Sequence, residues 1–174
     1  MDIQSRLKST ILDVADFPVP GIIFKDITPV LADGRLFAEL IGHYVDRYRG
    51  QGITQIVGIE SRGFLLGAPV AAALGVGLTL VRKPGKLPRQ TRKVTYDLEY
   101  GTDTLTMHAD ALTSADRVVI LDDVLATGGT ASATAELVES TGAQLHEFGF
   151  LMELSFLPGR QKMGERAVYS VLTY

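Results

Sequence analysis

No cysteine occurs in this sequence, which excludes disulfides, thiolate metal sites and cysteine nucleophiles. An excess of basic residues is also missing. The 17 lysines and arginines are outnumbered by 20 acidic residues, giving a formal charge of −3, which argues against a nucleic-acid-binding protein. No apolar run is long enough to cross a bilayer, and the first residues are polar and of mixed charge, unlike a signal peptide. We therefore expect a cytoplasmic protein that binds neither nucleic acid nor membranes.

What the chain does contain is ordinary for a globular protein. Hydrophobic residues make up 46% and charged residues 21% of the sequence. Its length is enough for one domain with a substantial core. We therefore expect a single domain over residues 1–174, with no internal repeats and no interdomain linker. The three histidines, His43, His108 and His146, are widely spaced, and we interpret them as structural residues.

Apolar patterning predicts strands that alternate with helices. Helices are expected over 3–13, over a stretch capped by Asp33 with an apolar stripe at 36–44, over 63–74 and over 131–141. Strands are expected at 55–59, 78–81, 118–121, 145–152 and 168–172, with a hairpin formed by 94–100 and 104–108. Residues 83–93 are expected to form a basic loop. The alternation is typical of an α/β fold with a doubly wound, mostly parallel sheet and flanking helices.

The most informative segment is VVILDDVLATGGT at residues 118–130. Its four leading apolar residues suit a strand buried on both faces of a parallel sheet, and Asp122 and Asp123 follow where that strand should end. A short run of Ala, Thr and Gly then leads into a helix that begins near Thr130. The backbone N–H groups of such a loop and helix terminus can bind a phosphate. The carboxylates can accept hydrogen bonds from ribose hydroxyls or lie near a hydrated Mg²⁺.

A simple connection between a strand and a helix, with an acidic rim and a Gly-Gly turn, would give a similar pattern. Two adjacent acids followed at once by Thr-Gly-Gly-Thr favour a phosphate site instead. The segment is not a P-loop, because the GxxxxGK pattern is missing. No GxGxxG follows the strand, so it is not a dinucleotide fingerprint either. The segment therefore predicts a site for a phosphorylated sugar.

Residues 118–130 resemble the phosphoribosyl-pyrophosphate signature of the type I phosphoribosyltransferases. Three more segments resemble those members of the family that use adenine: FPVPGIIFKDITP at 17–29, GIESRGF at 58–64 and YDLEYG at 96–101. The resemblance implies transfer of the phosphoribosyl group of phosphoribosyl pyrophosphate to adenine, giving AMP and pyrophosphate for purine salvage. It implies Mg²⁺ bound through the substrate, with no dedicated protein cage. It also implies a homodimer, a flexible β-hairpin lid and a small hood formed by N-terminal and C-terminal segments.

By this resemblance, Asp122 and Asp123 hold the ribose hydroxyls. The sugar phosphate binds the five residues Ala126, Thr127, Gly128, Gly129 and Thr130. The pyrophosphate binds Ser61, Arg62, Arg82, Lys83 and Lys86, where the basic residues act in the same or in the partner subunit. The resemblance further implies a cis peptide near Ser61. Two alternatives remain: Arg62 could pair with Glu60, and the segment 82–89 could be a solvated basic loop.

The resemblance places adenine at Ile23, Phe24, Lys25 and Leu157. Phe24 offers a flat apolar face for stacking, although it could be a plain core residue. Backbone groups of Ile23 and Lys25 could read the exocyclic amine, and Lys25 replaces an arginine found in many relatives. The candidate catalytic residues are Arg62, Glu99 and Tyr100: Glu99 accepts a proton from the base, and Tyr100 closes over the reacting carbon. From the pattern alone, Glu99 and Tyr100 could equally be exposed hairpin residues.

Two other functions remain compatible with the sequence. The acceptor could be another purine, such as xanthine or hypoxanthine, although Glu99 and the segment 23–25 argue against it. The chain could also be a non-catalytic regulator of the same fold that senses nucleotides. Such a regulator would need a DNA-binding segment or a basic face, and the sequence shows neither.

Overall fold

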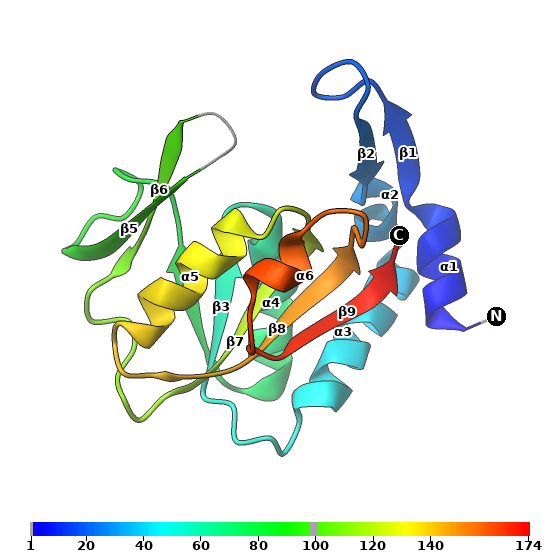
Figure 1. Ribbon diagram of the computed structural model, residues 1–174. Helices are drawn as coiled ribbons and strands as arrows, with labels where there is room; N and C mark the ends of the chain where they lie inside the picture. Colours follow the sequence, from blue (N-terminus) through cyan, green and yellow to red (C-terminus); the bar gives the residue numbers. More distant parts are fainter. Residues whose placement is uncertain (1, 98–100) are drawn as a thin grey trace. The chain divides into compact units, whose positions relative to one another are not determined.

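The computed structural model describes residues 2–97 and 101–174, and the chain divides into two units, Met1–Asp46 and Arg47–Tyr174. The larger unit is built around a sheet in the order β4-β3-β7-β8-β9, in which all neighbouring strands are parallel (Figure 1). Its strands are β3 (Gln55–Ile59), β4 (Gly77–Val81), β7 (Arg117–Leu125), β8 (Gln144–Glu153) and β9 (Val168–Thr173). The strand order reverses between β3 and β7. This architecture confirms the predicted α/β fold.

The sheet of the larger unit has helices on both faces, because its central strands are apolar on both. The first apolar residues of β7, 118–121, are fully buried. Helices α4 (Arg62–Leu74) and α5 (Gly129–Glu139) cover opposite faces, with α5 in front of the sheet and α4 behind it in Figure 1. The short helix α6 (Gly159–Lys162) lies between β8 and β9 in the sequence. Both helices that flank the sheet therefore begin at the strand ends where the order reverses.

A two-stranded antiparallel hairpin also belongs to the larger unit. Its strands are β5 (Thr91–Asp97) and β6 (Thr102–His108), and residues 98–100 lie outside the described part of the chain. Leu105 and Met107 are buried in the core that also contains the α5 side chains, so the base of the hairpin packs on the body of this unit. The predicted hairpin is confirmed. Its first strand begins at Thr91, earlier than predicted, and so includes the last residues of the loop expected at 83–93.

The smaller unit contains a hairpin and the first helices of the chain. Its elements are α1 (Ile3–Thr10), β1 (Leu12–Ala15), β2 (Ile23–Asp26), α2 (Thr28–Ala32) and the start of α3 (Gly34–Tyr48). The predicted cap is confirmed, because the Asp33 carboxylate accepts hydrogen bonds from the amides of Arg35 and Leu36 at 3.0 and 3.1 Å. The prediction of a helix over 3–13 was too long. Leu12 and Asp13 instead pair with β2 in an antiparallel ladder.

The strand that leads to the two acids also differs from the prediction. We expected it to end at Leu121, but β7 continues to Leu125, so that Asp122 and Asp123 lie within the strand. The reason is β8, which keeps pairing with β7 as far as Leu125 and Glu153. Among the residues that the structure describes, no helix is both long and apolar enough to cross a membrane.

Candidate functional site

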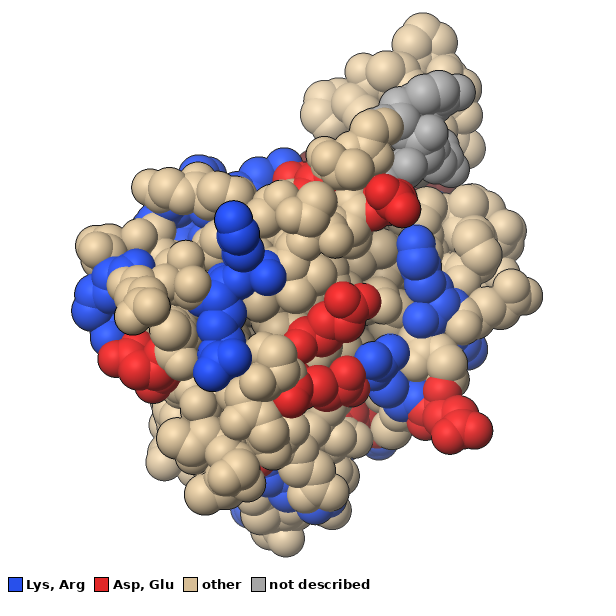
Figure 2. All heavy atoms as spheres, turned by 60° about the vertical axis from the view of Figure 1, so that its left-hand side comes forward, with Lys and Arg blue, Asp and Glu red and all other residues tan. Residues whose placement is uncertain are grey.

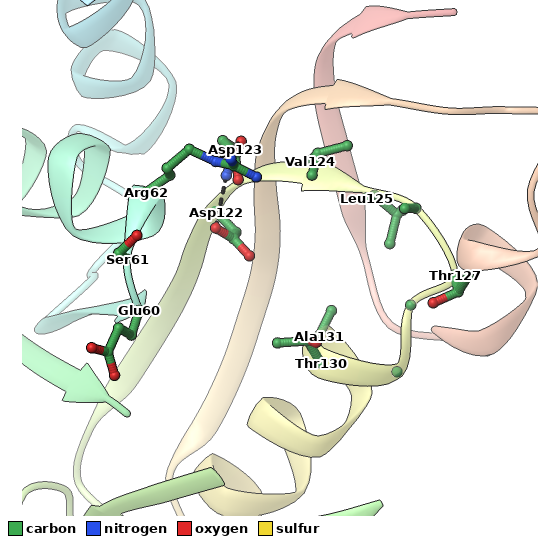
Figure 3. Close-up of a pocket in the computed structure, with 13 residues that line it drawn as sticks. Glu60, Ser61, Arg62, Asp122, Asp123, Val124, Leu125, Thr127, Thr130 and Ala131 are labelled. Atoms are coloured by element: carbon green, nitrogen blue, oxygen red, sulfur yellow. Dashed lines mark hydrogen bonds and ion pairs between the residues drawn. The ribbon is translucent and has the colours of Figure 1, made fainter. Parts of the chain in front are cut away.

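A cavity of about 370 Å³ opens where the strand order reverses (Figure 3). In open α/β sheets this switch point, at the carboxyl ends of the strands, is where ligands bind. Residues that follow β3 form one wall and residues from the end of β7 to the start of α5 form the other. The lining residues are Glu60, Ser61, Arg62, Asp122, Asp123, Val124, Leu125, Ala126, Thr127, Gly128, Gly129, Thr130 and Ala131.

The cavity exists because β7 is paired to different lengths on its two sides. Pairing with β3 ends at Leu121, whereas pairing with β8 continues to Leu125. On the β3 side, the last residues of β7 therefore have no neighbouring strand within the sheet. Because side chains alternate along a strand, Asp122 and Asp123 point to opposite faces. In Figure 3 the Asp122 carboxylate points toward the cavity, and Asp123 lies beside Arg62.

The two adjacent acids have different environments. The Nε atom of Arg62 lies 2.5 Å from Oδ2 of Asp123, whose side chain is only 5% exposed. Asp122 accepts a hydrogen bond of 2.9 Å from the amide of Asp123. Burial, and then the neighbouring Asp123 carboxylate, raise the pKa of Asp122 well above its usual value. A ligand that supplies hydroxyl hydrogen bonds or a cation would therefore stabilise the ionised form of Asp122.

The segment 126–130, which we call the phosphate loop, turns the chain sharply from β7 into α5. Gly128 has a φ of +80°, a conformation that favours glycine, and a Cβ there would lie 2.8 Å from the carbonyl oxygen of Gly159. A Cβ on Gly159 would in turn lie 2.2 Å from the Ala126 oxygen. The first amides of α5 have no partners within the helix. Two glycines thus pack the loop against α6 while the helix terminus meets the cavity.

The opposite wall is formed by the residues after β3. The peptide bond between Glu60 and Ser61 is cis, as the resemblance implied. Arg62 begins α4, and Gly63 packs so closely on β7 that a Cβ would lie 2.6 Å from the Leu121 oxygen. This close approach brings the start of α4, and with it the Arg62 guanidinium, to the end of β7.

The cations of the segment 82–89, which we call the basic loop, are held by carboxylates. Arg82 and Lys86 lie 2.9 and 2.8 Å from Oε1 of Glu60, and Lys83 lies 2.9 Å from Oδ2 of Asp103. Arg82 first, and then Lys86, lower the pKa of Glu60 to about 2. Positive and negative side chains are interspersed on the face that Figure 2 shows. The three predicted cations are outside the set that lines the cavity; Arg82 and Lys86 contact its rim through Glu60, whereas the Lys83 side chain is held by Asp103.

The residues predicted to bind adenine fall in both units. In the smaller unit, Phe24 lies on β2 with its ring centroid 5.1 Å from that of Phe17, in an edge-to-face contact. Lys25 forms an ion pair of 2.6 Å with Asp13 on the facing strand β1. In the larger unit, the amide of Leu157 donates to the Leu154 carbonyl between β8 and α6. Ile23 is well exposed at the start of β2.

Two predicted catalytic residues, Glu99 and Tyr100, lie outside the described residues. Two residues that line or adjoin the site were not predicted from the sequence. Glu60 was considered only as a partner of Arg62, yet it holds two cations of the basic loop. Tyr96 places its hydroxyl 3.1 Å from that of Thr130. The position of Glu60 directly before Ser61 was a signal for its role, whereas nothing local connects residues 96 and 130.

The described residues contain no cluster of three or more His, Cys, Asp or Glu side chains that could hold a metal. The acids present at the cavity are Glu60, Asp122 and Asp123. Glu60 and Asp123 are each engaged by cationic side chains, and Asp122 points into the cavity. This set fits a hydrated Mg²⁺ that reaches the site together with a phosphorylated ligand, since Mg²⁺ keeps several of its waters.

Residues 27–163 match the family model described as a phosphoribosyl transferase domain. Over 168 residues the chain is 55% identical to the adenine phosphoribosyltransferase of Syntrophotalea carbinolica, covering 97% of this chain and 98% of that protein. The crystal structure of adenine phosphoribosyltransferase from Thermoanaerobacter pseudethanolicus superposes with a TM-score of 0.95 at 48% identity, covering 98% and 99% of the two chains. The Saccharomyces cerevisiae enzyme, complexed with an iminoaltritol bisphosphate and adenine, has a TM-score of 0.92 at 42% identity over 98% of each chain.

Proposed function

This chain belongs to the phosphoribosyltransferase family, and we propose that it binds its phosphorylated sugar in the cavity at the ends of β3 and β7. It transfers the phosphoribosyl group of phosphoribosyl pyrophosphate to adenine and gives AMP and pyrophosphate. The reaction is a glycosyl (pentosyl) transfer that serves purine salvage. The observation that supports the site most strongly is the meeting of the phosphate loop, Asp122 and Arg62 around one cavity.

In this proposal the sugar phosphate binds at the phosphate loop. Its oxygens accept hydrogen bonds from the backbone amides of residues 126–130 and from the hydroxyls of Thr127 and Thr130. Asp122 and Asp123 are proposed to accept hydrogen bonds from the ribose hydroxyls; Asp122 points into the cavity, and Asp123 also forms an ion pair with Arg62. Groups from a single strand and from the helix that follows it thereby hold the ribose in place. This positioning contributes to the acceleration of the reaction.

The pyrophosphate leaves toward the opposite wall. Ser61 and Arg62 contact it there, and Arg82, Lys83 and Lys86 contribute the remaining positive charge. In the structure these three loop cations lie on Glu60 and Asp103, so binding the donor requires an exchange of carboxylate partners for phosphate oxygens. Mg²⁺ bound through the substrate would neutralise part of the charge on the leaving group.

Phe24 and Leu157 are proposed to contact adenine, and backbone groups of Ile23 and Lys25 are proposed to hydrogen-bond its amine edge. A carbonyl that accepts from the 6-amino group would face the oxygen of a 6-oxopurine, leaving two acceptors opposed. Glu99 is proposed to accept a proton from the base, and Tyr100 to close over the reacting carbon. A closed site would exclude water, which could otherwise attack the ribose in place of adenine.

We place these roles in one phosphoribosyltransferase domain over residues 1–174, in a homodimer that acts in the cytoplasm. The family resemblance supports both the assembly and the compartment proposed here. Sedimentation at micromolar concentration should give twice the mass of the 18.8 kDa chain.

One assay tests the function. The protein, phosphoribosyl pyrophosphate, Mg²⁺ and adenine should yield AMP and pyrophosphate, while hypoxanthine and xanthine should react far more slowly. The double variant Asp122→Asn, Asp123→Asn should lose most turnover, and Asp110→Asn, an acid outside the cavity lining, should retain it. Faster turnover of a 6-oxopurine would overturn the choice of acceptor. Ligand binding without any product would instead favour a nucleotide-sensing regulator.

A further inference from the structure

One tyrosine hydroxyl connects the β5–β6 hairpin to the wall of the cavity. The Tyr96 Oη atom on β5 lies 3.1 Å from the Thr130 Oγ1 atom in the first turn of α5. Thr130 lines the cavity, whereas Tyr96 is outside its lining and lies against Gly129 and Ser132 of α5. A Cβ on Gly129 would lie 3.3 Å from the Tyr96 ring, so the absence of a side chain there makes room for the ring. Tyr96 is therefore packed on the start of the helix that carries the phosphate loop.

The same hydroxyl has a second partner on the other strand of the hairpin. Its oxygen lies 3.5 Å from Oδ2 of Asp103, which faces Tyr96 in the β5–β6 register. The Asp103 carboxylate is held by Lys83 at 2.9 Å and by the amide of Thr104 at 2.8 Å. Lys83 lowers the pKa of Asp103, so this group is an ionised acceptor at neutral pH. Tyr96 thus lies between a carboxylate of the hairpin and a hydroxyl of the cavity wall.

Each of the two hydroxyls has a single hydrogen, and this decides which of them donates in the Tyr96–Thr130 contact. A fully ionised phosphate monoester can only accept hydrogen bonds, so a Thr130 hydroxyl that binds it must donate its single hydrogen. The Thr130 oxygen can then only accept a hydrogen bond, and Tyr96 is the hydroxyl within reach to donate one. Without phosphate, Thr130 can instead donate to Tyr96, and Tyr96 can donate to Asp103. The two arrangements use the same atoms and differ only in where the hydrogens point.

We propose that Tyr96 is a positioning residue, whose hydroxyl donates to Thr130 when the sugar phosphate is bound and thereby ties the hairpin to the phosphate loop. This inference rests on the proposed function, because it takes Thr130 as a phosphate ligand. It concerns a phosphate monoester at the loop and not the pyrophosphate at the opposite wall. The binding of the sugar phosphate and the placement of the hairpin are then coupled, and the coupling is reciprocal.

The variant Tyr96→Phe tests the inference, because it removes one oxygen and keeps the ring over Gly129. The Kd for ribose 5-phosphate should rise about fivefold to tenfold, as expected for one hydrogen bond that supports a charged group. The Kd for inorganic pyrophosphate should stay unchanged. The KM for phosphoribosyl pyrophosphate should rise by a similar factor as the ribose 5-phosphate Kd, with little change in kcat. An equal loss for ribose 5-phosphate and pyrophosphate would indicate a general structural role and would overturn the inference.

Thr95→Val is the matched control on the same strand. The Thr95 hydroxyl also makes a hydrogen bond across the hairpin, 2.9 Å from Thr104 Oγ1, but this contact does not involve the phosphate loop. The control keeps a β-branched residue in β5 and removes one hydroxyl, as Tyr96→Phe does. It should leave both dissociation constants and the KM unchanged. A shift in Thr95→Val equal to that in Tyr96→Phe would mean that any damage to the hairpin suffices, which contradicts the inference.

A double-mutant cycle separates this inference from the proposed site. Thr130→Ala should weaken ribose 5-phosphate binding, and adding Tyr96→Phe should then have no further effect. Thr130→Ser keeps the hydroxyl and should retain the response to Tyr96→Phe. If Thr130→Ala leaves ribose 5-phosphate binding unchanged, Thr130 is not a phosphate ligand, and the premise that this inference takes from the proposed function is wrong. If Thr130→Ala weakens binding but Tyr96→Phe does not, the site stands and only the role of Tyr96 is refuted.

Discussion

The two walls of the cavity hold charge in different ways. The β7 wall, formed by Asp122, Asp123 and the phosphate loop, relies on backbone groups and on side chains buried in the sheet. The basic loop near the opposite wall relies on long side chains, which lie on Glu60 and Asp103 in the structure. The β7 wall is shaped by the main chain, whereas the basic loop beside the opposite wall is assembled from ion pairs of long, partly exposed side chains.

From this difference we expect the β7 wall to hold the part of the substrate that stays bound, and the basic loop to contact the part that leaves. A backbone site cannot rearrange without breaking the packing of β7 and α5, so it suits the sugar phosphate, which stays bound through the reaction. Ion pairs between long, partly exposed side chains can exchange partners without disturbing the sheet, which suits the proposed binding and release of pyrophosphate. We therefore expect substitutions in the β7 wall to have larger effects than equivalent substitutions in the basic loop.

The largest contrast should come from two glycines with the same backbone conformation. Gly128 of the phosphate loop and Gly85 of the basic loop have φ values of +80° and +81°. A Cβ on Gly128 would meet the Gly159 oxygen, whereas nothing lies within 4 Å of a Cβ on Gly85. Gly128→Ala should reduce kcat/KM for the donor about 100-fold, since the loop must shift. Gly85→Ala should cost only the backbone strain of about 1 kcal/mol, measured by thermal unfolding. Equal kinetic effects would refute the contrast.

Within the β7 wall, the two acids should respond in opposite directions when stability is measured. Asp123→Asn removes the partner of Arg62 and should destabilise the fold by about 1–3 kcal/mol. Asp122→Asn should stabilise the ligand-free protein at neutral pH, because the raised pKa of Asp122 means that its ionisation opposes folding. Both variants should lose about tenfold or more in turnover, as each disturbs a charge-assisted contact.

The pH dependence tests the assignment for Asp122. A folded-state pKa above the usual 3.8 adds stability at low pH, and this contribution is lost as the pH rises through the folded-state value. Unfolding midpoints measured upward from pH 4 should therefore favour Asp122→Asn over the wild type increasingly as pH rises. A constant difference across that range would contradict the assignment.

Next to the basic loop, Glu60→Gln should change stability and ligand binding less than the substitutions in the β7 wall do. The usual pKa of 4.5 is lowered to about 2 by Arg82 and Lys86, so Glu60 stabilises the fold above pH 4.5 and less as the pH falls toward 2. Acid unfolding of the variant should be less steep in that window. Its affinity for inorganic pyrophosphate should rise about twofold to fivefold at low salt, because a competing carboxylate is gone. Glu165→Gln, an exposed acid elsewhere, is the control, and weaker pyrophosphate binding by Glu60→Gln would contradict the exchange of partners.

The smallest effect is expected for the last cation of the basic loop. Arg89 pairs with Asp110, and both side chains are more than half exposed. An exposed pair of this kind contributes about 0–1 kcal/mol, so Arg89→Ala should change the free energy of unfolding by no more than that. The kcat/KM for the donor should change less than about twofold. If Arg89→Ala reduced kcat/KM for the donor as much as Arg82→Ala does, all cations of the basic loop would contribute alike, as a nonspecific basic patch, which contradicts this prediction.

The sequence was most informative where structure is decided locally. The apolar run, the two acids and the Gly/Thr turn of residues 118–130 are adjacent in the sequence, so this pattern can be recognised without knowing any distant contact. The strand β3 likewise matches its predicted bounds of 55–59. The Asp33 cap is equally local, because its hydrogen bonds reach residues two and three positions away. The strand β3, the Asp33 cap and the turn from β7 into α5 can therefore be predicted from short stretches of sequence.

What could not be predicted depends on residues far apart in the chain. The strand β1 forms because Leu12 pairs opposite Asp26, and no local pattern distinguishes it from the end of a helix. The extension of β7 through both acids depends on β8. Glu60 meets cations 22 and 26 residues away, and Tyr96 meets a hydroxyl 34 residues away. These contacts decide how the cavity is charged, so composition and motifs alone could not supply them.

A crystal structure with AMP would test the different roles of the two walls most directly. We predict that the phosphate of AMP accepts hydrogen bonds from amides of residues 127–130, with the ribose hydroxyls at Asp122 and the basic loop still on its carboxylates. A phosphate bound instead to Arg82, Lys83 or Lys86, with the phosphate loop vacant, would contradict the account.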